Sequence, residues 1–332
     1  MKKYDVVGIG SALLDFTYEV DDSLINDLGL KKGEMQLIDN NKSKEILKKL
    51  VKYPVKISPG GSSSNTVAGV AFLGGKSVLL GKVGKDEYGK IYETMTKESN
   101  VISRLKKHEF EITGHAITFI NPDGQRSFAT NLGASQYLVK EDLDEEYIRD
   151  SKFLHIEGYL LENPNLRSVV LEAIKIAKIS GTIVSLDLSD SGLIKRNLDL
   201  FKEFVKEYVD IVFANETEAK AFTDKEPGDA VFDISDISEI AVVKLGENGS
   251  LLRSNKILVE IPAYKNPDFK NTNGAGDSFA AGFLFGLVNE LDLEKSGKLA
   301  SYVASLVVGN SGARLEKSDL EKITKFRFTK LL

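Results

Sequence analysis

Short apolar runs rich in Val and Ile recur along this chain, and longer stretches with helical spacing of apolar residues separate them. The runs lie at residues 6–9, 77–80, 182–186, 210–213 and 240–243. Continuous apolar character is what a strand needs when a parallel sheet buries both of its faces. The helical stretches lie at residues 65–73, 168–179 and 193–208. This alternation predicts an α/β fold in which helices flank a central, mainly parallel sheet.

Residues 112–131 depart from this alternation. Polar and apolar residues alternate on both sides of Asn121-Pro122-Asp123-Gly124, a sequence typical of hairpin turns. Residues 12–39 alternate in the same way. We predict that the two stretches pair as a small antiparallel sheet that projects from the main sheet as a lid. No low-complexity linker interrupts the chain, so we expect one domain over residues 1–332. We assign its core to approximately 1–11, 40–111 and 132–332, and its lid to approximately 12–39 and 112–131.

The composition excludes several classes of protein. Lys and Arg number 44, and Asp and Glu number 49, so the net charge of −5 argues against a broad basic face for nucleic acid. The chain has no Cys, which excludes disulfides and thiolate zinc sites. No segment approaches the roughly 20 apolar residues that span a bilayer. We therefore expect a soluble, cytoplasmic protein that binds neither nucleic acid nor a membrane.

The run Gly274-Ala275-Gly276-Asp277 opens a strongly apolar segment with the composition of a buried helix. Small residues at a helix start leave backbone N–H groups uncovered, and the helix dipole favours negative charge there. This arrangement suits the charge that develops on a phosphoryl group during transfer. The carboxylate of Asp277 could accept the proton of an attacking hydroxyl. The alternative is structural: a tight glycine loop followed by an acidic residue in a first helical turn.

Two further motifs precede predicted helices. Gly60-Gly61 lets the backbone approach a ligand closely, and Asn65 offers both a donor and an acceptor. A flexible loop with Asn65 as a helix cap explains the same residues. Asn215 and Glu218 follow a buried strand with capping-box spacing, and a carboxylate there can also hold Mg²⁺. Taken alone, each motif is better explained by structure than by function.

Two more features favour phosphate binding. Lys244, Gly246 and Gly249 follow a buried strand, so the glycines could admit a nucleotide. Arg126 follows the hairpin turn and could bind a transferred phosphoryl group with two donors. An ordinary exposed arginine is the commoner case.

Two nucleotide-binding motifs are excluded. Gly75-Lys76-Ser77 has Val70 where a P-loop needs glycine, and it lies in helix–turn–strand order. Gly8-Ile9-Gly10 lacks the third glycine of a dinucleotide fingerprint. These departures argue against a P-loop ATPase and a Rossmann dehydrogenase.

Together, the motifs resemble those of the PfkB family of carbohydrate and nucleoside kinases, also called the ribokinase family. The resemblance covers nearly the whole chain, and the motifs occur in family order. They are Gly60-Gly61 with Asn65, residues 81–89, residues 215–218 and residues 274–277. The phrases at 28–39, 131–135, 215–219 and 272–277 look most like the adenosine kinase branch.

This resemblance implies a ribokinase-like three-layer fold with a small β-sheet lid, and it implies a role for each motif. Asp277 would be the catalytic base, the amides of Gly274, Ala275 and Gly276 would form an anion hole, and Arg126 would close over the transferred group. The implied substrate-binding residues are Ser11, Asp15, Met35, Leu37, Gly60, Gly61 and Asn65. The implied ATP-binding residues are Asn215, Lys244, Gly246, Gly249 and Asn273, and Glu218 would hold Mg²⁺ through water.

Two positions depart from the family pattern. Many members have Asp where this chain has Asn271, and that carboxylate contributes to a monovalent-cation site beside the anion hole. K⁺ is therefore an optional cofactor beside ATP and Mg²⁺, since an amide oxygen can coordinate a cation but carries no charge. The branch often has Asn where Ser11 stands, which weakens one expected ribose contact.

The resemblance implies an ATP-dependent kinase that phosphorylates the 5′-hydroxyl of adenosine or a related nucleoside. A kinase for ribose, fructose or a keto-sugar acid is the alternative. A catalytically silent binding protein is a third hypothesis, against which the intact Gly274–Asp277 run argues. Lid sheets in this family pair between subunits in some members, so we expect a monomer or a homodimer.

Overall fold

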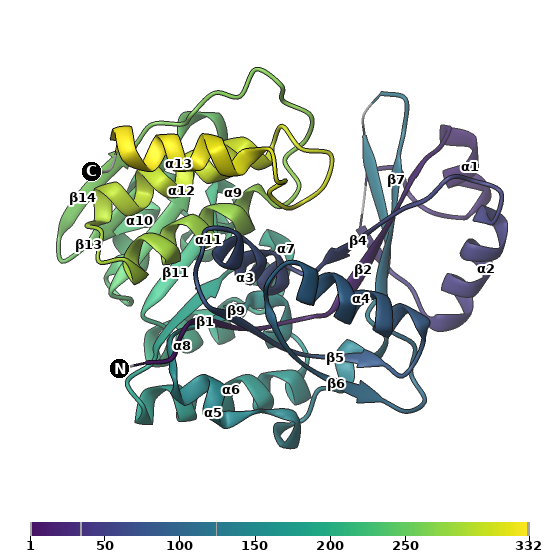
Figure 1. Cartoon of the computed structure of the whole chain (residues 1–332), viewed down its shortest axis with the longest axis horizontal. Helices are drawn as coiled ribbons and strands as arrows, with labels where there is room; N and C mark the ends of the chain where they lie inside the picture. The colour runs from purple at the N-terminus through teal and green to yellow at the C-terminus, as the bar shows by residue number, and fades with distance from the viewer. Residues whose placement is uncertain (1, 34, 124, 331–332) are drawn as a thin grey trace.

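The computed structural model describes residues 2–33, 35–123 and 125–330, and the strands of this part form two sheets (Figure 1). The larger sheet contains, in spatial order, β14 (Ile257–Ile261), β13 (Ser250–Ser254), β12 (Ile240–Lys244), β11 (Ile211–Asn215), β10 (Ile183–Asp187), β9 (Ser151–Glu157), β1 (Tyr4–Ile9), β5 (Ser77–Gly84) and β6 (Ile102–His108). Neighbouring strands from β12 to β6 run parallel, and β13 and β14 add an antiparallel edge. The predicted mainly parallel sheet is confirmed.

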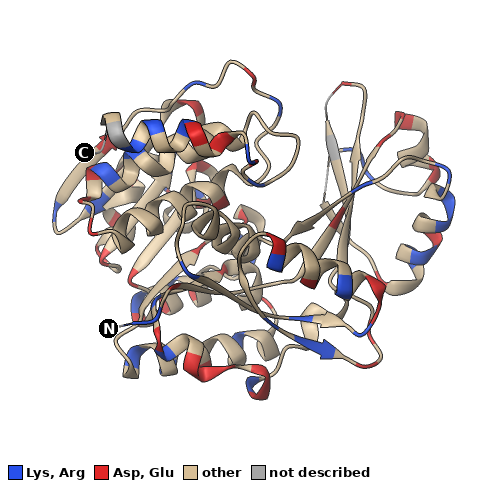
Figure 2. Cartoon of the chain, viewed as in Figure 1, with Lys and Arg blue, Asp and Glu red and all other residues tan. Residues whose placement is uncertain are grey.

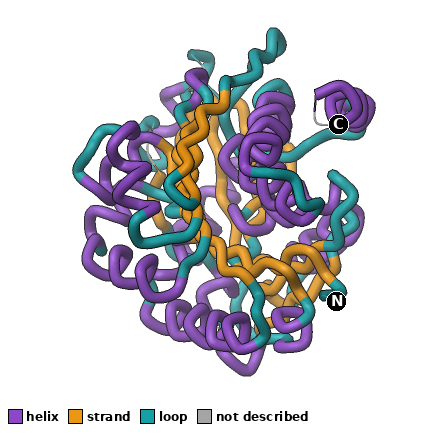
Figure 3. The backbone as a smooth tube through the Cα atoms, turned by 90° about the vertical axis from the view of Figure 1, so that its left-hand side faces the viewer, coloured by secondary structure: helices purple, strands orange, loops and turns teal. Residues whose placement is uncertain are grey.

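Helices cover both faces of the main sheet, as Figure 3 shows from the side. One face packs against α3 (Ser62–Phe72), α4 (Glu87–Glu98), α11 (Ala275–Val288), α12 (Leu293–Val307) and α13 (Asp319–Lys330). The other packs against α5 (Glu145–Arg149), α6 (Pro164–Ile179), α7 (Ser191–Arg196), α8 (Leu198–Tyr208), α9 (Glu216–Thr223) and α10 (Pro227–Ser235). Short 3-10 turns occur at Gly133–Tyr137, Lys140–Asp142, Gly158–Leu161 and Gly246–Asn248. The single helix predicted at 193–208 is two helices, α7 and α8, which meet at Asn197.

The smaller sheet has the strand order β3 (Met35–Leu37), β8 (Arg126–Asn131), β7 (Gly114–Ile120), β2 (Leu13–Glu19) and β4 (Lys56–Gly60). It projects from the main body together with α1 (Asp22–Asp27) and α2 (Asn40–Leu50), on the right in Figure 1. The predicted second sheet is therefore present, and β7 and β8 form the predicted antiparallel hairpin.

Two details of the predicted lid are wrong. The stretches 12–39 and 112–131 pair in parallel, β2 with β7 and β3 with β8, because long connections rather than tight turns join them. The lid also includes β4, which lies within residues 40–111 that we assigned to the core. Pro59 lies in β4, and an edge strand tolerates proline because its outer N–H groups need no strand partner.

The helix α11 is buried over most of its length, and small residues let its neighbours approach closely. A Cβ placed on Gly282 would lie 2.8 Å from the Ala300 Cα of α12, and one on Gly69 of α3 would lie 2.6 Å from the Ala281 Cβ. Any larger side chain would separate these helices. The close packing fixes the position of the α11 N-terminus relative to α3.

Charged residues are spread over both parts of the molecule. Figure 2 shows Lys and Arg interspersed with Asp and Glu along the outer helices, in keeping with the small net charge of −5. None of the helices in the described part of the chain is long and apolar enough to cross a bilayer.

Candidate active site

A large cleft of about 1280 Å³ has lining residues from both sheets. Its lid side includes Leu13, Asp15, Met35, Leu37, Ala116 and Thr130. Its core side includes the carboxyl ends of parallel strands, which carry Asp187, Asn215 and Lys244, and the first turn of α11. Ligand sites at the carboxyl ends of parallel strands are the rule in such sheets. The volume exceeds the roughly 300–1,000 Å³ of a typical single-ligand pocket, so two small ligands can fit side by side.

Gly274 begins α11 in a left-handed conformation with a φ of 72°. A Cβ at this position would clash with the carbonyl oxygen of Ala313, so only glycine fits without displacement. The first amides of α11 have no carbonyl of a preceding turn to bind. The Ala275 amide instead donates to the Thr272 carbonyl over 3.2 Å. The predicted anion-hole amide of Ala275 is therefore already bonded within the protein, and the amide of Gly276, which also lines the cleft in this turn, is a donor that remains for a ligand.

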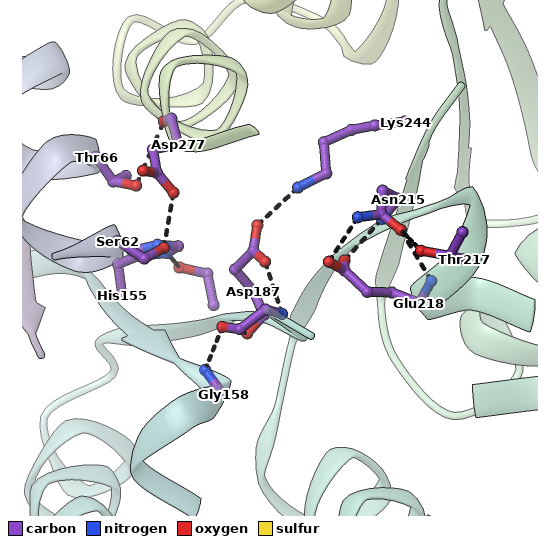
Figure 4. A network of polar contacts seen from close by, with 12 residues as sticks. Ser62, Thr66, His155, Gly158, Asp187, Asn215, Thr217, Glu218, Lys244 and Asp277 are labelled. Atoms are coloured by element: carbon purple, nitrogen blue, oxygen red, sulfur yellow. Dashed lines mark hydrogen bonds and ion pairs between the residues drawn. The ribbon is translucent and has the colours of Figure 1, made fainter. Parts of the chain in front are cut away.

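Asp277 is half-buried in the first turn of α11 and faces α3 across the base of the cleft (Figure 4). Its Oδ1 accepts a hydrogen bond from Ser62 Oγ at 2.7 Å, and its Oδ2 accepts one from Asn65 Nδ2 at 2.9 Å. Desolvation raises the pKa of Asp277 to about 6, although the hydrogen bonds from Asn65 and Ser62 oppose this shift. The carboxylate is thus oriented on both oxygens and more basic than an exposed aspartate.

Lys244 and Asp187 form an ion pair across the ends of β12 and β10, with 2.8 Å between Lys244 Nζ and Asp187 Oδ2 (Figure 4). Burial alone would lower the pKa of Lys244, but the carboxylates of Asp187 and Glu218 outweigh it and raise the pKa. The ammonium group also lies beside the start of α11, since a Cβ on Gly276 would be 3.1 Å from Lys244 Nζ. A positive charge therefore adjoins the first turn of α11 at Gly276.

Asn215 and Glu218 form the capping box that their spacing predicts (Figure 4). Glu218 Oε2 accepts from the Asn215 amide at 2.8 Å, and Asn215 Oδ1 accepts from the Glu218 amide at 2.9 Å. Burial, followed by the nearby Asp187, raises the pKa of Glu218 to about 7. The described residues contain no cluster of three or more metal-binding side chains. Glu218 and Asp187 nevertheless offer carboxylate oxygens to a cation that keeps several other ligands.

The lid side of the cleft is built around Asp15, Gly60 and Gly61. A Cβ on Gly60 would lie 2.6 Å from Asp15 Oδ2, so glycine is needed for this carboxylate to approach the backbone. Gly61 has a φ of 93°, and a Cβ there would clash with the Ser11 carbonyl oxygen. The Ser11 amide donates to the buried Glu157 Oε1 at 2.8 Å. Ser11, Asp15, Gly61 and Asn65, four of the predicted substrate-binding residues, therefore line the same part of the cleft. Gly60 is not among the lining residues but contacts Asp15 from β4.

Met35 and Leu37 line the cleft from the edge strand β3, where their exposed fractions are 52% and 62%. On the opposite side, Gly246 and Gly249 also line the cleft, but both have positive φ values in the turn before β13. A Cβ on Gly249 would clash with the Ile261 carbonyl oxygen, so the turn by itself explains this glycine.

Asn271 uses both ends of its amide within the protein. Its Oδ1 accepts from the Asn273 amide at 2.9 Å, and its Nδ2 donates to the Asn310 carbonyl at 2.9 Å. One partner can only donate and the other can only accept, so they fix the orientation of the Asn271 amide. A cation bound to the Asn310 carbonyl oxygen would be repelled by the Asn271 N–H₂ group, which points at the same oxygen. The residues present therefore do not fit the monovalent-cation site that the resemblance implied.

A family model described as pfkB family carbohydrate kinase matches residues 30–319. The chain belongs to this family. The predicted family membership is confirmed, and the chain is accordingly a phosphotransferase that acts on an alcohol group. PfkB kinases in general use ATP and Mg²⁺.

Solved structures and curated proteins extend this comparison. A probable sugar kinase from Rhizobium etli CFN 42 is 32% identical, with a TM-score of 0.91 over 98% of this chain and 99% of that one. The adenosine kinase from Sinorhizobium meliloti is 34% identical, with a TM-score of 0.89 over 97% and 99%. The 5-dehydro-2-deoxygluconokinase of Listeria innocua is 27% identical over 320 residues, which cover 92% of this chain and 90% of that protein. These likenesses confirm the ribokinase-like fold.

One predicted residue of this PfkB kinase has no described side chain, and two functional candidates were not predicted. The backbone of Arg126 begins β8, but its side chain lies outside the described part of the structure. Asp187 was not predicted, although its position at the end of a buried strand is the same signal that singled out Lys244. Arg314, which donates to Asn65 Oδ1 at 2.9 Å, carries no motif and was also missed.

Proposed function

We propose that this PfkB kinase transfers the γ-phosphoryl group of ATP to a hydroxyl group of a small molecule, with Asp277 as the general base. The position of Asp277 carries the proposal, because its carboxylate lines a two-ligand cleft at the start of α11. A pKa of about 6 leaves the carboxylate ionised at neutral pH and still basic enough to accept the hydroxyl proton as the new O–P bond forms.

The ATP phosphates would lie between the first amides of α11 and the Lys244 ammonium group, where two sources of positive potential meet. Asp187 and Glu218 would hold Mg²⁺, with water and phosphate oxygens completing its coordination. The raised pKa of Glu218, at about 7, reflects burial and repulsion by Asp187, and a divalent cation would relieve that repulsion. When bound, Mg²⁺ neutralises charge on the phosphate oxygens.

Two substrate classes compete for the acceptor site. The comparisons support a sugar better than a nucleoside, because the family description and the curated relatives are named for carbohydrates. One solved relative is an adenosine kinase. The curated relatives are named for a gluconate, which is a sugar acid and carries a negative charge.

The lining of the cleft favours a neutral substrate. Among the described lining residues on the lid side, none is Lys or Arg, and Asp15 is acidic. Glu157, at the end of the core strand β9, adds a second acidic residue to the lining. A sugar acid would need a cationic partner at this end. Apolar side chains also gather there, at Leu13, Met35, Leu37, Ala116 and Leu132. This surface suits a planar base beside a ribose, so we place a nucleoside first and a neutral sugar second.

A substrate panel with ADP detection tests this order. Adenosine and other nucleosides, ribose, fructose and 5-dehydro-2-deoxygluconate would each be offered with ATP and Mg²⁺. We expect turnover with a nucleoside, and with no sugar acid. Turnover of free sugars alone would leave the kinase proposal intact and eliminate the nucleoside. Turnover of the sugar acid would contradict the argument from the lining charges.

A further inference from the structure

Arg314 lies in the segment between α12 and α13, and its guanidinium group reaches α3. Its Nε donates to Asn65 Oδ1 at 2.9 Å, and its Nη2 donates to Ser64 Oγ at 2.8 Å. Ser64 Oγ also accepts from the buried Tyr92 hydroxyl at 2.7 Å. Arg314 is therefore part of a polar network that reaches Asp277 through Asn65.

The amide of Asn65 has a defined orientation only because of its two partners. Its Nδ2 donates to Asp277 Oδ2 at 2.9 Å, while its Oδ1 accepts from Arg314. A carboxylate can only accept, and a guanidinium group can only donate. Rotating the Asn65 amide by 180° would oppose its oxygen to the carboxylate and its N–H₂ to the guanidinium group. Both contacts would be repulsive, so the pair of partners selects one rotamer.

We infer that Arg314 is a positioning residue for phosphoryl transfer, which acts by holding the Asn65 N–H₂ group on the catalytic carboxylate. The inference rests on the proposed role of Asp277 as the base. Without Arg314, Asn65 could turn its oxygen toward Asp277, and the carboxylate would lose one of its two side-chain donors. The remaining donor, Ser62, holds only Oδ1.

The segment that carries Arg314 is tied to the start of α11. The carbonyl of Ala313 lies where a side chain on Gly274 would otherwise be. Asn310 Nδ2 donates to the Arg314 carbonyl at 3.2 Å, and Asn271 Nδ2 in turn donates to the Asn310 carbonyl at 2.9 Å. The loop before α11 and the backbone of Arg314 therefore keep a fixed separation.

Arg314 also changes the electrostatic environment of the base. The charged groups that act on Asp277 come from β9, β10, β12 and the Arg314 segment, and they are Glu157, Asp187, Lys244 and Arg314. Asp15 on β2 is a further acid within reach of Arg314. Two anions on the core strands oppose ionisation of Asp277, whereas Lys244 and Arg314 favour it. Loss of Arg314 should therefore raise the pKa of Asp277 and move the acid limb of the pH–rate profile to higher pH.

The test compares Arg314→Met, Arg314→Lys and the control Arg327→Met. Arg327 lies on α13 over the ring of Phe285, so its replacement removes a cation and a packing contact about two turns along α11 from Asp277. For Arg314→Met we expect a kcat lowered roughly ten- to a hundredfold and an acid limb moved up by about one pH unit. For Arg314→Lys the charge remains, so the limb should move less, while kcat falls because one ammonium group cannot bind Asn65 and Ser64 in the same geometry.

Thermal unfolding separates positioning from a loss of fold. Suppose that Arg314→Met melts at the same temperature as the control. A wild-type kcat in that variant then overturns the inference, and so does a lowered kcat with no shift in the acid limb of its pH–rate profile. If Arg314→Met does not fold, a wild-type kcat in Arg314→Lys overturns it. Asp277→Asn, assayed in parallel, distinguishes the two proposals. Unchanged turnover in Asp277→Asn removes the proposed base, whereas inactive Asp277→Asn with an unaffected Arg314→Met removes only the role of Arg314.

Discussion

At the scale of single residues, the hydrogen bonds to Asp277 set both its orientation and its basicity. Burial raises the pKa of this carboxyl group to about 6, and Ser62 and Asn65 limit the rise by donating to the ionised form. If Asp277 is the base, kcat/KM should increase as the pH rises through about 6 and then level off, because only the ionised carboxylate accepts the substrate proton.

Ser62→Ala tests whether the hydrogen bond from Ser62 limits the rise in the pKa of Asp277. Removing the Ser62 hydroxyl deletes the bond to Asp277 Oδ1, so the pKa of Asp277 should rise and the acid limb of kcat/KM should move to higher pH. We expect a larger loss of rate at pH 6 than at pH 8, measured as initial ADP formation. Ser168→Ala is the control, since among the described residues its hydroxyl donates to the Asn165 carbonyl of the same helix, α6. A uniform loss at both pH values would contradict the assignment.

Asn271 gives a second prediction at this scale. Because its amide already bonds the Asn310 carbonyl, we propose that the wild-type rate is the same in K⁺ and in Na⁺ buffers. Asn271→Asp replaces this N–H₂ with an oxygen and adds a charge, which recreates the acidic group that many family members have. The variant should become activated by K⁺, observed as a rise in kcat on titration with KCl at constant ionic strength. Activation of the wild type by K⁺ would show that the Asn271 amide does not prevent a cation from binding at this position.

At the scale of secondary-structure elements, the site depends on where α11 begins. Gly274→Ala places a side chain at a φ of 72° and against the Ala313 carbonyl. The left-handed conformation alone costs about 1–2 kcal/mol for a residue with a Cβ. We expect a lower melting temperature and a kcat reduced at least tenfold, because the first amides of α11 would shift.

The matched control for Gly274→Ala is Gly228→Ala. Gly228 lies in the first turn of α10, where an added Cβ meets no atom within 4 Å. This change should leave kcat unaltered and keep or raise stability, by up to about 1 kcal/mol. Equal stability and equal rates for the two variants would argue that the start of α11 tolerates rearrangement.

The elements also show where sequence reasoning succeeds and where it stops. The capping box at Asn215 and the helix start at Gly274 are local patterns, so their geometry followed from spacing. The parallel pairing of β2 with β7 did not follow, because alternation fixes which face is buried but not the direction of the partner strand. Arg314 was missed because its partner Asn65 is 249 positions away and no pattern near Arg314 marks it.

At the scale of the whole molecule, the cleft lies between a lid sheet and the carboxyl ends of the main sheet. Motifs far apart in sequence lie together there, because each one either follows a strand of a sheet or begins a helix that packs on the main sheet. Family order was therefore enough to predict the fold, and it also named several residues that line the core side of the cleft. The resemblance also named Met35 and Leu37 of the lid strand β3, and both line the cleft. The identity of the substrate could not be predicted in the same way, since it depends on how the side chains of such short lid strands are arranged.

The lid side of the cleft yields a prediction about substrate affinity. Leu37 is 62% exposed on the edge strand β3, and we expect a bound substrate to cover it. Leu37→Ala should raise KM for the acceptor roughly tenfold, through lost apolar burial, with little change in KM for ATP. Val51→Ala is the control, because Val51 is 81% exposed but does not line the cleft. An unchanged acceptor KM in Leu37→Ala would place the substrate away from β3.

The whole account depends on Asp277 as the group that takes the substrate proton. The most direct measurement is the single-turnover rate of Asp277→Asn with saturating ATP, Mg²⁺ and the best acceptor from the panel, with ATP binding checked by calorimetry. We predict that ATP affinity is retained and that the rate falls by roughly 10²–10⁴-fold, the usual contribution of a general base. A rate within a few-fold of the wild type, at unchanged ATP affinity, would contradict the account.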